Sequence, residues 1–171
     1  MNEKKLNVLT LALGIALLPP IWAVISPYLG VTTGAVALIC AGIFVANGNK
    51  VEDGVKISIG FLLGDLWGCI ALEAMDMVKL NQNIELFCAL FILGGLAVII
   101  SSTKLEKIIF LPAWLAGWAI TLLIMAPLNM NWGTLPIQIG VSMLMGVWYV
   151  GVGVLKFQNL LITIIKNNSI R

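Results

Sequence analysis

Apolar residues occur in six long stretches along the chain, and short polar or turn-forming segments separate them. A helix needs about 20 predominantly apolar residues to cross the hydrocarbon core of a bilayer. The pattern therefore predicts an all-α, polytopic membrane protein in which residues 1–171 form a single transmembrane domain. We expect six transmembrane helices, at about 6–25, 31–46, 56–77, 84–100, 108–126 and 134–155.

The segment after the sixth stretch, 156–171, is predicted to be a short cytoplasmic tail. Its sequence FQNLLITIIK is mildly amphipathic, which is typical of a helix on the membrane surface. Lys and Arg indicate the orientation, since they are enriched in cytoplasmic loops. With both termini in the cytoplasm only Lys79 lies outside, and nine basic residues lie inside, namely Lys4, Lys5, Lys50, Lys56, Lys104, Lys107, Lys156, Lys166 and Arg171.

Composition agrees with a membrane protein and argues against several function classes. Hydrophobic residues make up 60% of the chain and charged residues only 11%, whereas soluble domains carry about 25% charged residues. The net charge of +2 and the lack of a basic run argue against a nucleic-acid partner. Because the chain has no histidine and no paired metal ligands, we predict no enzymatic activity, no metal site and no cofactor.

Two adjacent prolines, Pro19 and Pro20, lie inside the first apolar stretch. Proline removes a backbone donor, and its ring clashes with the carbonyl group one turn earlier. We therefore expect the first helix to be broken at this point, with the freed carbonyl groups facing protein or water. Pro112 and Pro136 are expected in the first turns of their helices, where proline is ordinary.

Asp65 lies near the middle of the third predicted span, where a lone carboxyl group is costly. No Lys or Arg lies in the interior of a span, so the group is either protonated or balanced by water or a cationic ligand. On a helix, Ser58, Cys69 and Asp76 share its face. Two interpretations follow, a solute or proton site and a protonated acid that bonds a neighbouring helix.

Glycines recur on another side of the same span, at Gly60, Gly64 and Gly68. Small residues at four-residue spacing let two helices approach closely. We therefore predict a helix-packing face here, and a second close approach at Gly94 and Gly95 in the fourth span.

A weak internal repeat relates the third and fifth spans. Residues 50–67 resemble residues 104–120, and the sequence GFLLGDLWG can be aligned with AWLAGWAIT. The two copies would share one topology, which makes this a parallel repeat. Chance similarity between apolar segments is the alternative.

Other side chains inside the spans are candidates for a solute path. Trp67, Trp114 and Trp118 would line a pore or hold a cation over their rings, or else pack against helices or lipid. Thr121 and Gln138 would hydrogen-bond a polar solute, or else link neighbouring helices.

Several segments share the order and character of a known family. They are LPPIW, GAVALICAGIFVANGN, GVKISIGFLLGDLWG, FLPAWLAGWAI and LPIQIGVSMLMGVWYVG. Together they resemble the YcdZ-like proteins, a bacterial inner-membrane family built around a domain of unknown function. The resemblance covers most of residues 13–153 and implies a multi-pass protein of the bacterial inner membrane.

Two functional hypotheses result. The first is a channel or transporter, a homo-oligomer in the lipid bilayer, for a small cationic or neutral polar solute such as an amine, ammonium, urea or a short amide. In this hypothesis Asp65 lines or gates the path. The alternative is a non-transporting scaffold or assembly protein that the glycine face holds together.

Overall fold

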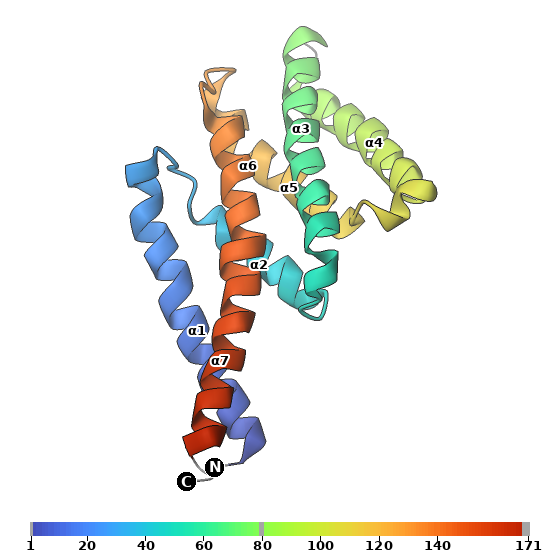
Figure 1. Ribbon diagram of the computed structural model, residues 1–171. Helices are drawn as coiled ribbons and strands as arrows, with labels where there is room; N and C mark the ends of the chain where they lie inside the picture. Colours follow the sequence, from blue (N-terminus) through green and yellow to red (C-terminus); the bar gives the residue numbers. More distant parts are fainter. Residues whose placement is uncertain (1, 79–80, 169–171) are drawn as a thin grey trace.

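The computed structural model describes residues 2–78 and 81–168, and the regular structure in these ranges is helical. The main elements in Figure 1 are α1 (Glu3–Ile25), α2 (Val36–Ala46), α3 (Gly54–Val78), α4 (Gln82–Ser101), α5 (Leu111–Met125), α6 (Leu135–Met145) and α7 (Gly153–Asn168). Shorter elements are the 3₁₀ helices η1 (Ser26–Leu29), η2 (Val51–Asp53), η3 (Lys104–Lys107) and η4 (Ala126–Leu128), and the π-helix η5 (Gly146–Val152). Lys79 and Arg171, which enter the predicted orientation, lie outside the described residues.

Within the described residues, five helical segments are long and apolar enough to cross a membrane, which confirms an all-helical membrane protein. The apolar helix α2 is shorter, since its 11 residues span about 16 Å, roughly half of the hydrocarbon core. The second predicted span started at Val31, but the helix begins only at Val36. The backbone N–H of Thr32 donates to Gln138 Oε1 of α6 at 2.9 Å, so this segment bonds to a neighbour instead of extending the helix. The number of spans and their orientation stay predictions.

The prediction that the first helix breaks at Pro19 and Pro20 was wrong. α1 is one continuous helix with both prolines inside it. The fixed φ of proline is close to the helical value, and helices in lipid tolerate proline where neighbours relieve the lost backbone bonds. Pro19 is buried against α2 and α7, whereas Pro20 is exposed.

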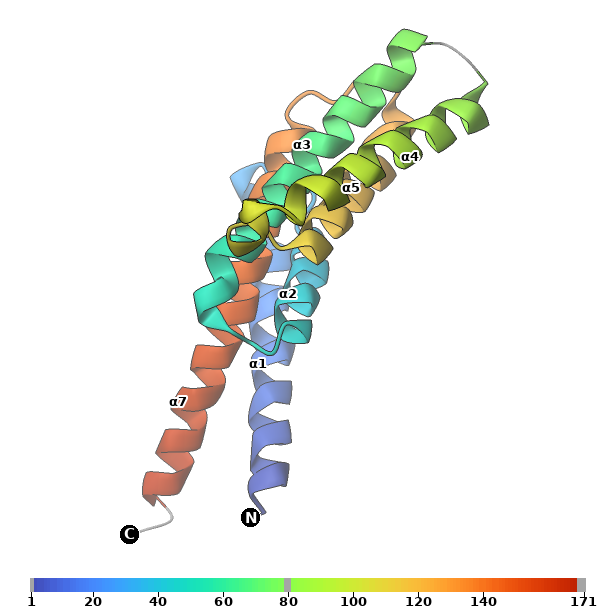
Figure 2. The ribbon, with the colours of Figure 1, turned by 90° about the vertical axis from the view of Figure 1, so that its right-hand side faces the viewer.

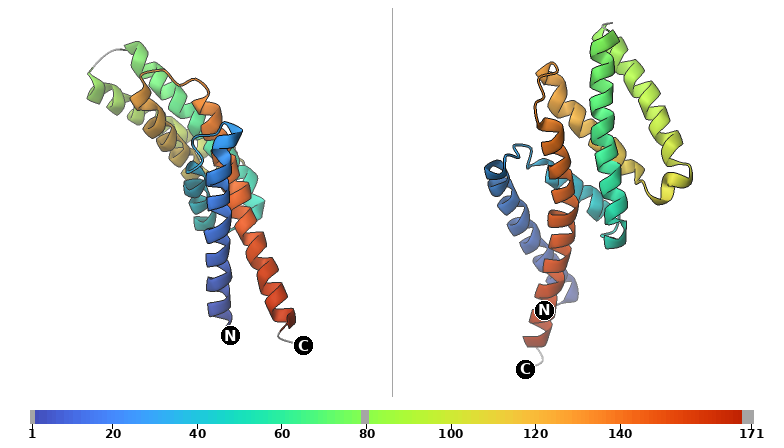
Figure 3. Two further views of the ribbon diagram at one scale, coloured as in Figure 1. Left: turned by 90° about the vertical axis from the view of Figure 1, so that its left-hand side faces the viewer. Right: turned by 45° about the horizontal axis from the view of Figure 1, so that its top comes forward.

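The predicted tail after the sixth span, 156–171, continues that span as helix as far as Asn168, and its cytoplasmic location stays a prediction. α6, η5 and α7 form one uninterrupted helical rod that starts at Leu135 (Figure 2). Its α7 part lies beside α1, as both views in Figure 3 show. Gln158 Nε2 donates to the carbonyl oxygen of Asn7 at 3.1 Å, and Lys166 Nζ pairs with Glu3 Oε1 at 2.9 Å. Contacts with α1 therefore hold the segment that was expected on the membrane surface.

A close crossing of α3 and α5 forms the centre of one half of the molecule. A Cβ atom added to Gly64 would lie 2.6 Å from the backbone nitrogen of Trp118 and 2.9 Å from the carbonyl carbon of Gly117. One added to Gly60 would lie 2.6 Å from the carbonyl oxygen of Phe110, and Gly68 faces Thr121. The two backbones are therefore in direct contact, which only glycine allows.

The α3–α5 crossing brings together positions that the proposed repeat aligns. Gly60 lies against Ala113, and Gly64 lies against Gly117. The third aligned pair, Gly68 and Thr121, is also in contact. The resemblance between the two spans thus coincides with a parallel, in-register contact between them.

A second close crossing joins α2 to the π-helix η5. A Cβ atom on Gly146 would lie 2.5 Å from the carbonyl oxygen of Ala37 and 2.6 Å from Cβ of Cys40. One turn further along, a Cβ atom on Gly151 would lie 2.8 Å from the ring of Phe44. Glycines thus fix both crossings, and the rod packs on α2 as α3 packs on α5.

The apolar core lies between the two crossings. Its fully buried members come from α2, α3, α5 and the rod and include Phe44, Ile57, Phe61, Met143 and Val147. α1 begins and α7 ends at the same end of the molecule, called here the terminal end (Figure 1). The opposite end carries the α1–α2 and α5–α6 connections.

Candidate functional site

The carboxyl group of Asp65 is anchored by a single hydroxyl group from the neighbouring helix. Thr121 Oγ1 of α5 donates to Asp65 Oδ1 at 2.5 Å. Thr121 is fully buried, and Asp65 is only 7% exposed. The pair is close because Thr121 sits against Gly68, which has no side chain to keep α5 away. The glycine face of α3 therefore also brings the donor of Asp65 within hydrogen-bond distance.

The other carboxyl oxygen lies toward α6. A Cβ atom on Gly140 would be 3.6 Å from Asp65 Oδ2 and 3.3 Å from the side chain of Leu62, a tight contact. Between α3 and α6 the surface is hollowed into a groove of about 360 Å³. This groove, called here the α3–α6 groove, is lined by Leu62, Asp65, Leu66, Cys69, Pro136, Ile137, Gly140, Val141 and Leu144.

The walls of the α3–α6 groove are apolar, and they reach the outer surface of the bundle. Ile137 is 70% exposed and Leu66 is 54% exposed. In a membrane protein such exposed aliphatic side chains within long apolar helices face lipid. Asp65 therefore supplies the one carboxyl group among the lining residues of a groove whose mouth is apolar.

Toward the terminal end, a packed layer lies between Asp65 and the next polar contact. Phe61 from α3 and Met143 and Val147 from the rod form this layer, and all three are fully buried. Beyond it Trp148 Nε1 donates to Ser58 Oγ at 3.0 Å, and Ser58 Oγ donates to the carbonyl oxygen of Gly54 at 2.8 Å. Ser58 therefore does not line the groove with Asp65, although the two share a side of α3.

On another side of α6, side chains tie this helix to the segment before α2. Gln138 Oε1 accepts bonds from Thr32 N at 2.9 Å and Thr32 Oγ1 at 2.8 Å, and its Nε2 donates to Thr134 Oγ1 at 2.9 Å. The hydroxyl groups of Thr33 and Ser142 are 3.0 Å apart. Gln138 and Ser142 alternate along α6 with the groove residues, so these contacts lie at the level of the groove on another side of the helix.

The three tryptophans form a separate cluster with α4. Trp67 Nε1 donates to the carbonyl oxygen of Leu93 at 3.0 Å, and the Trp67 ring meets Trp114 edge-on at 5.2 Å between centroids. Trp114 and Trp118 are buried, and each has an Nε1 without a hydrogen-bond partner among the described residues. None of the three lines the α3–α6 groove.

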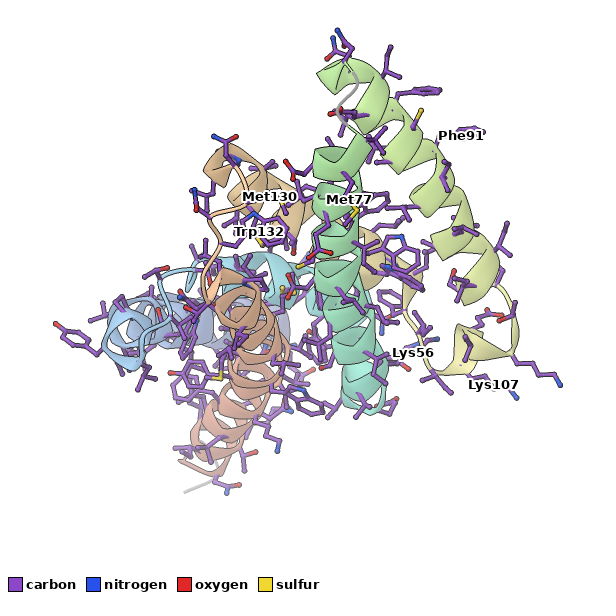
Figure 4. All side chains as sticks on the ribbon, turned by 90° about the horizontal axis from the view of Figure 1, so that it is seen from above. Lys56, Met77, Phe91, Lys107, Met130 and Trp132 are labelled. Carbon is purple, nitrogen blue, oxygen red and sulfur yellow. The ribbon has the colours of Figure 1, made fainter. Side chains whose placement is uncertain are left out.

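The remaining sequence candidates also lie elsewhere. Asp76 lines a hollow of about 390 Å³ at the opposite end, together with Glu85, Met130 and Trp132; Figure 4 views the molecule from this end and labels the last two. Pro19 lines an apolar hollow of about 270 Å³ between α1, α2 and α7. Gly94 faces the ring of Trp118, and Gly95 lies in open space.

Of the predicted candidates, the structure brings together Asp65, Cys69 and Thr121. Sequence reasoning missed Gly140, which gives Asp65 Oδ2 its room. The sequence feature that could have pointed to Gly140 is its position four residues after Pro136, which puts the two residues on the same face of the helix. Among the described residues, no group of three or more Cys, Asp and Glu is close enough to hold a metal ion.

Thr121→Val is expected to destabilise the protein by about 1–3 kcal/mol, because it leaves a buried carboxyl oxygen without its donor. Thr121→Ser keeps the hydroxyl group and should recover most of the loss. Unfolding of the purified protein in mixed micelles measures both variants. Thr163→Val, at an exposed threonine of α7, is the matched control, and an equal loss in both valine variants would contradict the assignment.

The structure is that of a polytopic helical membrane protein. It has long apolar helices, a core between two close helix crossings at glycines, and an ionisable group in the middle of a helix. The chain belongs to the family described as protein of unknown function (DUF1097), whose model matches residues 12–158. Searches of curated proteins and of solved structures gave no match. A family built around a domain of unknown function is therefore confirmed, and the narrower YcdZ-like resemblance is consistent with it.

Proposed function

We propose that the protein transports a small cationic or neutral polar solute across the membrane, with Asp65 as the group that binds it. The observation that carries the proposal is the carboxyl group itself. One of its oxygens is held by Thr121, and the other lies toward the α3–α6 groove beside Gly140. An ionisable side chain in mid-membrane is costly and is therefore a functional-site hypothesis by default.

The surroundings of Asp65 favour a cation over an anion. No Lys or Arg is present between Ile57 and Val78 of α3, or in α5 and α6. An anion at the groove would meet an acidic group without a basic partner. An amine, ammonium, urea or a short amide can donate hydrogen bonds to the carboxyl oxygen, and a cation adds charge attraction.

The packed layer favours a transporter over an open channel. A solute at Asp65 has to pass Phe61, Met143 and Val147 to reach the terminal end, and these side chains are fully buried. Passage therefore requires the rod to move against α3. The contact of Ser58 with Trp148 and the contacts of Gln138 are the polar links that such a movement would break and remake.

Asp65→Asn is expected to lower uptake of labelled methylammonium into reconstituted vesicles at least about tenfold, because the variant loses one charge-assisted hydrogen bond. Asp76→Asn is the matched control, since it makes the same change at an exposed position of the same helix. Labelled urea tests a neutral solute in the same vesicles. Uptake that is equal in the wild type and Asp65→Asn, in correctly folded protein, would overturn the proposal.

A scaffold is the second candidate function, and the exposed apolar surface of α4 favours it. Phe87 and Phe91 stack at 5.9 Å between centroids on this helix, and Phe91 is 72% exposed on its outer side (Figure 4). The glycine face is occupied by α5, so it would hold the fold rather than a partner. A protein that moves no solute under any condition would favour this candidate. A homo-oligomer in the bacterial inner membrane is proposed for both functions.

A further inference from the structure

The chemistry of the α3–α6 groove narrows the class of solute. Eight of its nine lining residues are apolar or carry no charged group, and Asp65 is the ninth. Binding sites combine apolar walls with a few placed polar groups, and the α3–α6 groove, an open hollow of about 360 Å³, has this composition. A fully hydrophilic ion would leave these walls unused, whereas an aliphatic chain would cover them.

The mouth of the groove indicates the route of entry. Leu66 in the middle of α3 and Val141 in the middle of α6 are exposed, and Ile137 is exposed in the first turn of α6, so the mouth opens on the side of the bundle. A solute dissolved in the bilayer reaches such a mouth directly. A solute in water would first have to enter the hydrocarbon, which is costly for an ion without an apolar part.

The carboxyl group indicates the head group. Thr121 donates a hydrogen bond to Oδ1 of Asp65, and the lack of a side chain at Gly140 leaves room beside Oδ2. A protonated primary amine donates a charge-assisted hydrogen bond to such an oxygen. A quaternary ammonium group has no N–H to donate and is usually held by aromatic rings, and the groove lining contains none.

We infer that the α3–α6 groove binds amphipathic primary amines, with the ammonium group on Asp65 and the aliphatic chain along Leu62, Val141 and Leu144, and that these solutes enter from the bilayer. The inference rests on the proposed function and names its substrate class. A second copy of the chain or the acyl chain of a phospholipid would use the same walls but would not need the carboxyl group.

The test uses the full chain in lipid nanodiscs and a photoreactive probe, a ten-carbon primary amine with a diazirine near the end of its chain. Mass spectrometry locates the labelled residues, and n-decylamine competes for the site. We expect labelling confined to α3 and α6, with at least tenfold weaker competition in Asp65→Asn. Gly140→Val should reduce labelling because its side chain fills the space beside Asp65 Oδ2, whereas Gly95→Val, which lies in open space, should not.

The controls separate the inference from the proposed function. The inference would be overturned if the matching ten-carbon alcohol with the same diazirine labelled the groove equally. It would also be overturned if labelling were spread evenly over α1 and α4, or if dimerisation of the chain protected the groove from labelling. Methylammonium uptake that depends on Asp65 without labelling of the groove would overturn the inference and leave the proposed function standing. Groove labelling that depends on Asp65, without transport of either amine, would support the binding site and overturn the proposed function.

Discussion

Gly64→Leu is expected to prevent recovery of folded, monodisperse protein. Overpacking in a core costs about 1–3 kcal/mol when flexible side chains can adjust. Here the nearest atoms belong to the backbone of Trp114, Trp118 and Gly117, which cannot move away without separating α3 from α5. Separation would also break the bond between Asp65 and Thr121. Size-exclusion chromatography of protein extracted in mild detergent measures the result.

Gly42→Leu is the matched control for the glycine crossing. Gly42 lies in the apolar helix α2, and nothing lies within 4 Å of a Cβ atom placed on it. This variant should elute as the wild type does, since leucine is a better helix former than glycine. If Gly64→Leu folded equally well, α3 and α5 would not be in backbone contact in the membrane.

Phe61→Ala is expected to destabilise the protein by at least about 2 kcal/mol. In soluble cores Phe→Ala costs about 3–5 kcal/mol. Part of that cost comes from moving the side chain out of water. A membrane protein lacks this part because lipid is as apolar as the protein core, so only the cost of lost packing remains. Phe61 is fully buried in the layer between Asp65 and the terminal end, where its removal leaves a cavity against Met143 and Val147. Unfolding in mixed micelles measures the loss.

Phe91→Ala provides the comparison for this core substitution. Phe91 is 72% exposed on α4, where lipid takes the place of protein neighbours. Its removal should change the free energy of unfolding by less than about 0.5 kcal/mol. Equal destabilisation by the two alanine variants would contradict the packed layer. A proton leak through Phe61→Ala vesicles, absent in Phe91→Ala, would show in addition that the layer acts as a seal.

The helical class and most helix positions follow from hydropathy, because a bilayer forces long apolar stretches into helices. Three features did not follow. Pro19 and Pro20 remain inside a continuous helix, since the fixed φ of proline is close to the helical value and helices in lipid tolerate proline. Residues 31–35 leave the helix because Gln138, more than a hundred positions later, bonds Thr32. The helix after Leu155 continues because α1 covers it.

The candidate site was readable in part. The cost of a mid-span carboxyl group singles out Asp65, and helical spacing puts Cys69 on the same face. Thr121 was one candidate among several, since nothing in the sequence tells which threonine meets the acid. Ser58 and Asp76 share the face but lie too far along the helix to share the groove. Contacts between helices decide these points, and spacing within one helix does not.

The rod from Leu135 onward has a mechanical consequence. Its 33 apolar-to-amphipathic residues extend over about 50 Å at 1.5 Å per residue, well beyond the roughly 30 Å of bilayer hydrocarbon. The crossing at Gly146 lies between the groove wall of α6 and the Lys166–Glu3 pair of α7. A tilt of the rod about that crossing would move its two ends in opposite directions, so that a wider groove at Asp65 would also displace Lys166 relative to Glu3.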